Sequence, residues 1–324
     1  MVLNARKSTY LFILLVTCYS IVSCAQESKS SYNILTGADQ TNLYISKLKG
    51  KRIAIVANQT SVISNGTNYT HLVDSLVSLK LNIQKVFAPE HGFRGKADAG
   101  ESIADGIDAK TGLPLISLYG KNKKPTTAQL KGIDLVIFDI QDVGARFYTY
   151  ISTLHYVMEA CAEKGIPLLL LDRPNPNGHY IDGPILEAAH KSFVGMHPVP
   201  VVYGMTIGEY GFMINGEKWL DNGIKASLTV VKLKNYTHSS AYNLPIKPSP
   251  NLPNKKAINL YPSLCFFEGT NVNAGRGTNM QFQIYGSPFL NTKSKFSFTP
   301  SPNEGAKYPK HAYMISYGED LRGT

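Results

Sequence analysis

Four short apolar runs constrain the fold of this chain more than any other feature of its sequence. They are Lys51–Ala57, Ile83–Ala88, Asp134–Ile140 and Pro167–Leu171. Between them lie segments in which apolar residues recur at helical spacing, as Leu154 and Met158 do. Continuous apolar strands that alternate with amphipathic helices are typical of parallel strands buried on both faces. The sequence therefore predicts an α/β fold with a doubly wound, mostly parallel sheet.

The sheet domain is expected to occupy residues 31–240, with Leu228–Leu233 as a late edge strand. The proline-rich segment Pro245–Pro253 follows it and has the composition of a connection between domains. We therefore predict a second, smaller α+β domain over residues 241–324.

Residues 1–24 have the pattern of a secretory signal, because basic residues precede an apolar stretch, Tyr10–Val16, that is too short to span a bilayer. Ile21–Cys24 fits a lipobox, which predicts cleavage and lipidation at Cys24. An ordinary signal peptide cut near Ala25 is the alternative. The lipobox predicts an exported lipoprotein of the bacterial cell envelope, periplasmic or associated with the outer membrane.

The composition, 43% hydrophobic and 17% charged, can fill a core and differs from that of a disordered chain. The formal net charge of +10 would favour an anionic cell-wall polymer or a membrane surface, although a lysine-coated soluble surface is the simpler explanation. No segment resembles a nucleic-acid-binding module. Cys161 and Cys265 are expected to be buried free thiols, because two isolated cysteines do not make a disulfide framework.

Several familiar catalytic signatures are missing from the sequence. There is no G-x-x-x-x-G-K-[ST] loop, and no G-x-G-x-x-G follows the first apolar run, which argues against a phosphate or dinucleotide site. There is also no G-x-S-x-G nucleophile elbow and no H-E-x-x-H metal motif. We therefore expect neither a cofactor nor a metal ion.

Polar pairs follow each of the four apolar runs. They are Asn58–Gln59, Glu90–His91, Gln141–Asp142 and Asp172–Arg173. In open α/β sheets, ligands bind at the carboxyl ends of the strands. The four pairs together predict a binding site at this edge.

Arginine is scarce in the chain, with 7 residues against 26 lysines. Four of the arginines nevertheless lie in the polar loops, namely Arg94, Arg146, Arg173 and Arg276. The planar guanidinium suits bidentate binding of carboxylates, so an acidic substrate is predicted. The alternative is that some of these arginines pair with Asp142 or Asp172 and stiffen the loops.

The predicted second domain carries its own motif, Phe266–Asn271 followed by Asn273–Thr278, in which small residues alternate with Glu, Asn and Arg. This composition suits a loop whose backbone approaches a ligand closely, although a tight surface turn is the alternative. By contrast, Thr206 and Glu209 fit a capping box, so Glu209 is expected to be structural.

Four motifs in order resemble the exo-β-N-acetylmuramidase family of bacterial cell-wall enzymes (the NamZ group): APEHGFRG (88–95), FDIQDVGARFYTY (138–150), LDRPNP (171–176) and FEGTNVNAGRGT (267–278). The resemblance runs from about Gly37 to the end of the chain. It implies a Rossmann-like domain followed by a smaller one, with the active site between them. It also implies a glycoside hydrolase that releases N-acetylmuramic acid from the non-reducing end of peptidoglycan fragments, in cell-wall turnover or recycling. Chains of this family usually continue past Thr324, so part of the second domain is expected to be missing.

Glycoside hydrolysis normally uses two carboxyl groups, about 5–5.5 Å apart in retaining enzymes and about 6.5–9.5 Å apart in inverting ones. We predict Glu90 as the general acid and Glu268 as the second group, with Asp142 as the alternative to Glu268. A nearby cation disfavours a protonated acid, so Arg94 should either face the substrate or hold Glu90 ionised. Predicted substrate contacts are His91, which would orient Glu90, and Arg94, Gln141, Asp142, Arg146, Tyr148, Asn175, Asn271 and Arg276.

Two other classes of protein fit the same residues. A non-catalytic lipoprotein that binds muropeptides would use the arginines without acid–base chemistry. A hydrolase of amide or ester bonds would release peptide or acetate, although the sequence shows no evident nucleophile or metal centre for it.

Overall fold

The computed structural model of the chain describes residues 33–95, 105–290 and 294–324. The predicted signal segment and Cys24 lie outside these ranges, so lipidation stays a prediction. Within the described ranges, no helix has both the length and the apolar character needed to cross a membrane.

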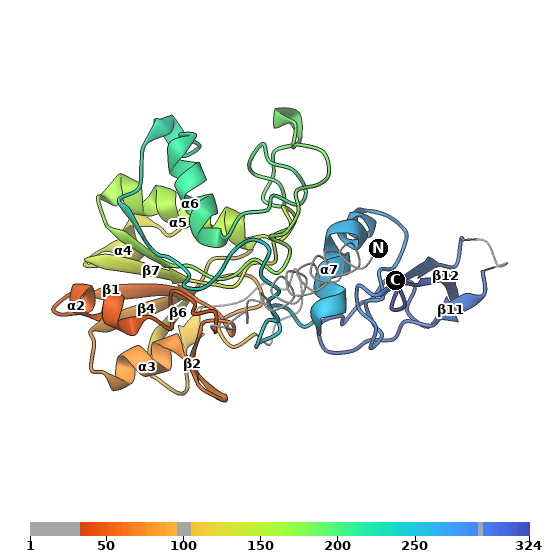
Figure 1. Ribbon diagram of the computed structural model, residues 1–324, viewed down its shortest axis with the longest axis horizontal. Coiled ribbons are helices and arrows are strands. Elements are labelled where there is room, and N and C mark those ends of the chain that lie inside the picture. The colour runs from red at the N-terminus through yellow and green to blue at the C-terminus, as the bar shows by residue number, and fades with distance from the viewer. Residues whose placement is uncertain (1–32, 96–104, 291–293) are drawn as a thin grey trace, which may run out of the picture. The chain divides into compact units, whose positions relative to one another are not determined.

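A seven-stranded sheet in the order β5-β6-β4-β1-β7-β8-β9 forms the centre of the larger part of the chain (Figure 1). Neighbouring strands are parallel except β5, which runs antiparallel to β6. The strands are β1 (Ile53–Ala57), β4 (Ile83–Ala88), β5 (Gly106–Ile107), β6 (Pro114–Ser117), β7 (Leu135–Asp139), β8 (Leu168–Leu171) and β9 (Leu228–Val231). The predicted fold class is confirmed, since the four apolar runs form the adjacent strands β4, β1, β7 and β8. The predicted edge strand is β9.

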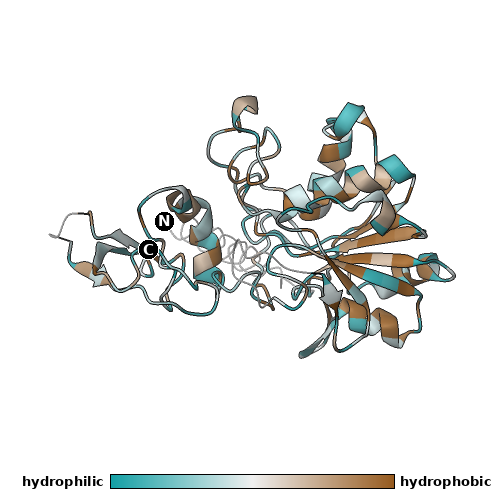
Figure 2. Ribbon diagram, turned by 180° about the vertical axis from the view of Figure 1, so that it is seen from behind, coloured by the Kyte–Doolittle hydropathy of each residue, from teal (hydrophilic) through white to brown (hydrophobic). Residues whose placement is uncertain are grey.

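Helices cover both faces of this sheet. Successive side chains of a strand point to opposite faces, so each central strand contributes to two cores. On β1, Ala54 and Val56 pack into the core that contains α4, α5 and α6. Ile53 and Ile55 pack into the other core, with α2 and α3. The helices are α2 (Ile45–Leu48), α3 (Leu72–Ser78), α4 (Thr127–Leu130), α5 (Tyr150–Lys164) and α6 (Ile207–Gly216). Figure 2 shows the central strands as mainly hydrophobic, as burial on both faces requires.

The ends of the two longer helices follow from local sequence. α5 is followed by Gly165, which has a left-handed conformation (φ 64°) that glycine adopts without a steric penalty. α6 begins with the predicted capping box: Thr206 Oγ1 accepts a bond from Glu209 N at 3.2 Å, and Glu209 Oε2 accepts one from Thr206 N at 2.9 Å. The structural role predicted for Glu209 is therefore confirmed.

The C-terminal part contains helix α7 (Lys255–Leu264), which leads into the 3₁₀ helix η4 (Cys265–Gly269). An antiparallel sheet in the order β10-β12-β11 follows, with β10 (Ile284–Ser287), β11 (Phe296–Phe298) and β12 (Ser316–Asp320). Smaller elements elsewhere are the hairpin β2 (Val62–Asn65) and β3 (Asn68–His71) and the 3₁₀ helices η1 (Thr41–Leu43), η2 (Ala188–His190) and η3 (Asp221–Gly223). Because the contacts join Ile34–Thr324 into one unit, the exact domain boundary stays a prediction.

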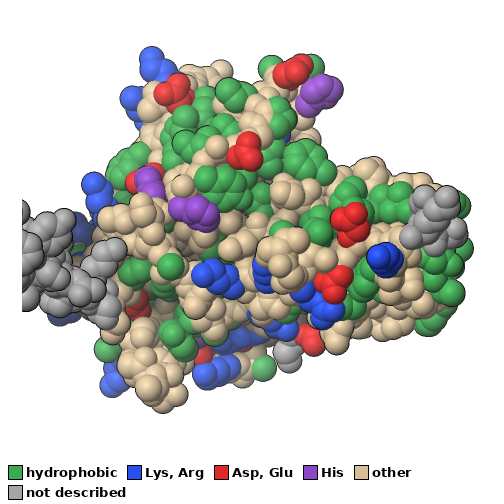
Figure 3. All heavy atoms as spheres, turned by 45° about the vertical axis from the view of Figure 1, so that its right-hand side comes forward, with side chains coloured by type: hydrophobic (Ala, Val, Ile, Leu, Met, Phe, Trp, Pro, Cys, Tyr) green, Lys and Arg blue, Asp and Glu red, His purple; other side chains and the backbone are tan. Residues whose placement is uncertain are grey.

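The surface carries charges of both signs (Figure 3), and the two described cysteines are buried. On the face shown in Figure 3, charged side chains of both signs lie among hydrophobic and uncharged ones. Cys161 and Cys265 are buried free thiols, as predicted. Burial raises the pKa of both thiols to about 12, so neither is a reactive thiolate at neutral pH.

Candidate active site

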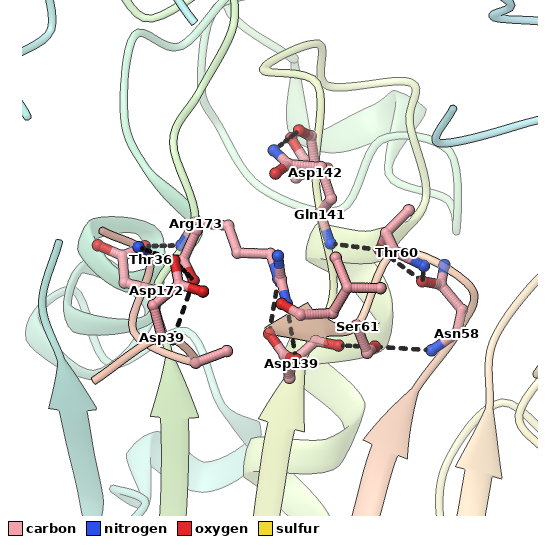
Figure 4. Close-up of polar contacts among 12 residues, drawn as sticks. Thr36, Asp39, Asn58, Thr60, Ser61, Asp139, Gln141, Asp142, Asp172 and Arg173 are labelled. Atoms are coloured by element: carbon pink, nitrogen blue, oxygen red, sulfur yellow. Dashed lines mark hydrogen bonds and ion pairs between the residues drawn. The ribbon is translucent and has the colours of Figure 1, made fainter. Parts of the chain in front are cut away.

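The polar residues predicted to share one edge of the sheet do lie together, because β4, β1, β7 and β8 are adjacent and parallel. Figure 4 shows side chains from the loops after β1, β7 and β8 in contact with one another. Asn58 Nδ2 donates a hydrogen bond to the Tyr150 hydroxyl at 2.9 Å, and Ser61 Oγ donates one to the backbone oxygen of Asp139. Most polar side chains at this edge therefore hydrogen-bond to other groups of the protein.

An ion pair between Arg173 and Asp139 lies in this network, with 2% and 0% of the two side chains exposed. Arg173 Nε and Nη2 donate to the two carboxylate oxygens at 2.6 and 2.8 Å, and Nη2 also donates to the carbonyl oxygen of Val62 at 3.0 Å. Burial raises the pKa of Asp139, and Arg173 opposes that shift. The partner is Asp139 and not Asp142 or Asp172, the two that the sequence suggested.

Gln141 and Asp142, both predicted substrate contacts, are buried and bonded to nearby groups. Asp142 Oδ2 accepts bonds from the Tyr203 hydroxyl and from Gly144 N, the latter at 2.7 Å. Burial raises the pKa of Asp142 to about 6. Gln141 Nε2 donates to the carbonyl oxygens of Asp142 and Pro174 at 2.7 and 2.6 Å. These contacts favour a structural role for Gln141 and Asp142, in support of the neighbouring loops.

Arg146 and Asn175 are also predicted substrate contacts, and each is 4% exposed. Arg146 Nη1 donates to the carbonyl oxygens of Val199 and Pro184, the latter at 2.8 Å. Asn175 Nδ2 donates to the carbonyl oxygen of Met205 at 2.8 Å. Both side chains therefore fasten loops to the sheet edge.

Arg94 lies close to Glu90 in the sequence, but its guanidinium is engaged by two other acids. Nε and Nη2 donate to the Asp108 carboxylate at 3.1 and 2.7 Å, and Nη2 donates to Asp74 at 3.0 Å. The group also lies over the Phe93 ring, 4.3 Å from its centre. Arg94 thus joins the loop after β4 to α3, an arrangement outside the two roles that the sequence suggested.

Glu90 and Glu268 line the same cavity, which has a volume of about 340 Å³. Glu90 comes from the loop after β4, and Glu268 belongs to η4. The predicted site residues His91, Tyr148 and Arg276 line this cavity as well. Its other walls are Tyr119, Phe147, Thr149, Val194, Ser249, Asn251, Leu252, Tyr261 and Phe282. The fold therefore brings the two predicted catalytic carboxyl groups to one space.

A tight turn presents Glu90. Gly92 N donates to the carbonyl oxygen of Pro89 at 3.0 Å, and His91 has a φ of 68°, which is uncommon for a residue other than glycine. Thr149 Oγ1 donates a hydrogen bond to Glu90 Oε2 at 2.7 Å. Backbone strain of this kind is concentrated at functional sites, so the turn itself supports a role for Glu90.

Glu268 has cationic neighbours. Its Oε1 lies 3.6 Å from Arg276 Nη1, and 39% of its side chain is exposed. Enclosure by the surrounding protein raises the pKa of Glu268, and the Glu90 carboxylate adds to this shift. The positive charges of Arg276 and Lys310 oppose it. A second cavity of about 260 Å³ shares Glu268 and Arg276 with the first and is also lined by Lys310.

The small residues beside Arg276 allow the backbone to pack against itself. Gly275 has a φ of 80°, and a Cβ atom there would lie 2.5 Å from the carbonyl oxygen of Met280. The sequence predicted that the backbone of this loop approaches a ligand closely. At Gly275 the close approach is instead to the backbone of Met280. Asn271, a predicted contact, is exposed, and its backbone oxygen bonds to His311 Nε2 at 2.6 Å.

The carbonyl oxygen of Pro248 fastens the proline-rich connection to the sheet edge. It accepts hydrogen bonds from Gln59 Nε2 and the Tyr148 hydroxyl, each at 2.9 Å, and a longer one from the Tyr150 hydroxyl at 3.5 Å. Pro248 lies between β9 and α7 in the chain. The segment that leads to η4 is therefore bonded to the edge that carries the polar loops.

Two family models match the chain: "Exo-beta-N-acetylmuramidase NamZ, N-terminal" over residues 53–256 and "Exo-beta-N-acetylmuramidase NamZ, C-terminal" over residues 259–324. The chain belongs to the NamZ family. It is 43% identical to the peptidoglycan beta-N-acetylmuramidase NamZ of Bacillus subtilis (strain 168) over 350 residues, which covers 98% of this chain and 81% of that protein.

Two solved structures resemble this NamZ-family chain, and both are DUF1343 family proteins of Bacteroides fragilis. One is 48% identical, with a TM-score of 0.82, and the match covers 90% of this chain and 78% of that one. The other is 30% identical, with a TM-score of 0.76, and the match covers 89% and 76% of the two chains. The family resemblance predicted from the four motifs is confirmed.

Sequence reasoning missed several polar residues of the NamZ-family cavity, among them Thr149 and Tyr119. Thr149 lies inside one of the four motifs, directly before a helical pattern. Its position in the motif could have identified it as a site residue. Tyr119 follows β6, whose short apolar stretch is interrupted by Pro114 and Ser117, so its signal was weaker.

Across the described ranges, no three His, Cys, Asp or Glu side chains lie together in a way that could hold a metal ion. His155 and His197 bond to each other at 2.9 Å, and His197 Nδ1 bonds to the Tyr210 hydroxyl at 3.0 Å. These imidazoles therefore serve internal packing.

Replacing Asp142 with asparagine is expected to remove a pH-dependent cost to stability. A carboxyl group whose pKa rises from 3.8 to about 6 on folding binds its proton more tightly in the native state. Stability from this group therefore falls as pH rises through that interval, by about 3 kcal/mol in all. The amide oxygen of Asn can still accept the bonds from Tyr203 and Gly144.

Urea unfolding of both proteins at several pH values measures this effect. The stability of Asp142→Asn relative to the wild type should increase between about pH 4 and pH 7. Parallel pH profiles for the two proteins would contradict the prediction.

Proposed function

We propose that this chain is an exo-β-N-acetylmuramidase, a glycosidase that releases N-acetylmuramic acid from the non-reducing end of peptidoglycan fragments. The cavity shared by Glu90 and Glu268 carries the proposal. Most glycosidases place one carboxylic acid and one carboxylate beside the bond that breaks. Membership of the NamZ family and the activity named for the Bacillus subtilis relative support the same chemistry.

The charge around the cavity supports an acidic sugar as substrate. Arg276 lines both cavities, and Lys310 lines the second one. Lys310 Nζ donates to the carbonyl oxygens of Phe267, Glu268 and Thr270 at 2.9, 2.9 and 2.6 Å, so its positive charge is held in place. Muramic acid bears a lactyl carboxylate, which these cations would attract.

Mass spectrometry of the products from a disaccharide of N-acetylmuramic acid and N-acetylglucosamine tests the proposal. Free N-acetylmuramic acid is the expected product. A longer glycan that begins with muramic acid should lose only that terminal sugar. An intact disaccharide would favour the muropeptide-binding alternative, and release of peptide or acetate from a muropeptide would identify a hydrolase of another bond.

Attachment to the cell envelope is the other part of the proposal. Its support is the sequence Ile21–Cys24 after a short apolar stretch, which is typical of lipoprotein precursors. Mass spectrometry of the mature N-terminal peptide should find acyl chains on Cys24. An unmodified peptide that begins near Ala25 would instead indicate ordinary secretion.

A further inference from the structure

We propose that Glu90 acts as the anionic catalytic group and Glu268 as the proton donor to the leaving oxygen, with Thr149 and Tyr119 as positioning residues for Glu90. This division of roles rests on the proposed function. It reverses the assignment made from the sequence, in which Glu90 was the acid.

The first support is the bond between Glu90 and the start of α5. Thr149 is the N-cap residue of this 15-residue helix, yet its side chain makes no capping bond to the helix. Its hydroxyl instead donates to Glu90 Oε2 at 2.7 Å. The N-terminus of a helix carries a partial positive charge, which stabilises a nearby anion. Glu90 is therefore placed where a negative charge is favoured.

The second support is Tyr119, which lines the same cavity as Glu90. Burial raises the pKa of Tyr119, and the Glu90 carboxylate raises it further. The phenol therefore keeps its proton at neutral pH and is available as a donor. The Thr149 hydroxyl, which donates to Glu90 Oε2, and the protonated phenol of Tyr119 in the same cavity both favour the ionised form of Glu90, because a carboxylate only accepts hydrogen bonds.

The third support is the different setting of Glu268. Arg276 Nη1 lies 3.6 Å from its carboxylate, longer than a direct hydrogen bond. Enclosure by the surrounding protein favours the protonated form of Glu268, and the negative charge of Glu90 in the same cavity adds to this, against the opposing charges of Arg276 and Lys310. The net effect of these surroundings is to raise the pKa of Glu268, so the proton is placed on Glu268.

The reaction balances with these roles. Glu268 gives its proton to the glycosidic oxygen as the bond from that oxygen to C1 breaks, so the second sugar leaves with a free hydroxyl group. The Glu90 carboxylate either takes a proton from the water that attacks C1 or bonds to C1 itself until water displaces it. In both courses one water is consumed, with its hydroxyl on C1 and its proton returned to the carboxyl pair.

Two substrates separate the roles of the two carboxyl groups in this protein. The first is the disaccharide, whose leaving sugar needs a proton. The second is a 2,4-dinitrophenyl β-glycoside of N-acetylmuramic acid, whose leaving group departs without one. Glu268→Gln should lose about 10²- to 10⁴-fold in kcat on the disaccharide and far less on the aryl glycoside. Glu90→Gln should lose activity on both substrates.

The opposite pattern, in which Glu90→Gln alone retains the aryl activity, would overturn the assignment. Equal losses for Glu268→Gln on both substrates would overturn it too. Thermal unfolding of each variant excludes loss of the fold as the cause. If the wild type cleaves neither substrate, it is the proposed function that fails, so the two failures are distinguishable.

The positioning residues need a readout that a purely structural role would not change. Thr149→Val removes the hydroxyl donor to Glu90, and Tyr119→Phe removes a second hydroxyl from the same cavity, so kcat on the aryl glycoside should fall about 10- to 100-fold with little change in KM. Thr149→Ser keeps the hydroxyl and should recover most of the lost kcat. An unchanged kcat in Thr149→Val and Tyr119→Phe would contradict the positioning role.

Discussion

Replacing Arg173 with methionine is expected to lower the free energy of unfolding by about 3–5 kcal/mol. The change removes the bidentate partner of Asp139 and leaves a carboxylate whose side chain is 0% exposed. An uncompensated buried charge is costly because no water can replace the lost partner. The loss should be smaller at low pH, where Asp139 is protonated. Guanidinium chloride unfolding at pH 7 and pH 4 measures both effects.

Two further variants make this result specific. Arg322→Met removes a pair with Asp320 in which 51% and 29% of the side chains are exposed, and it should change stability very little. The double variant Asp139→Leu with Arg173→Met replaces the ion pair by apolar side chains and should recover part of the loss. If Arg173→Met were as stable as Arg322→Met, the buried pair would not hold the sheet edge together.

Replacing Glu90 with glutamine is expected to lower kcat for the disaccharide by about 10²- to 10⁴-fold, since it removes the charge but keeps the shape of the side chain. Glutamine can still accept the bond from Thr149 Oγ1, so the turn after β4 should persist. KM should change much less than kcat, because the other walls of the cavity are intact. Initial rates of N-acetylmuramic acid release measure both constants.

Glu217→Gln is the matched control for this variant. Glu217 is exposed and follows α6, and its replacement makes the same change of charge. Its kcat should equal that of the wild type, and both variants should unfold at the wild-type temperature. A normal kcat in Glu90→Gln would show that Glu90 is not a catalytic residue.

The parallel sheet could be predicted from the sequence because burial on both faces leaves a direct trace in composition. β1, β7 and β8 have only buried residues, and each appears as an apolar run. β5 and β6 left a weaker trace, because β5 has two exposed residues and β6 begins with an exposed proline. Tyr119, which follows β6, was missed for the same reason.

The candidate site was predicted only in part, because a sequence does not separate polar residues that face a ligand from those that hold loops. Arg146 and Glu90 both stand in polar motifs after a strand. Arg146 Nη1 bonds to the carbonyl oxygens of Pro184 and Val199, whereas Glu90 lines the cavity. Since every residue has a carbonyl group, no residue type marks such an acceptor in advance.

The anchorage of the proline-rich connection also affects which substitutions the protein can tolerate. Its acceptor is the backbone oxygen of Pro248, which every amino acid would supply at that position. These bonds therefore place no demand on the type of side chain at position 248, provided that the backbone keeps its path. The donors Gln59 and Tyr148 have no such freedom, because their bonds are made by side chains. Retention of these bonds therefore depends on the side chains of Gln59 and Tyr148 and on the backbone of Pro248.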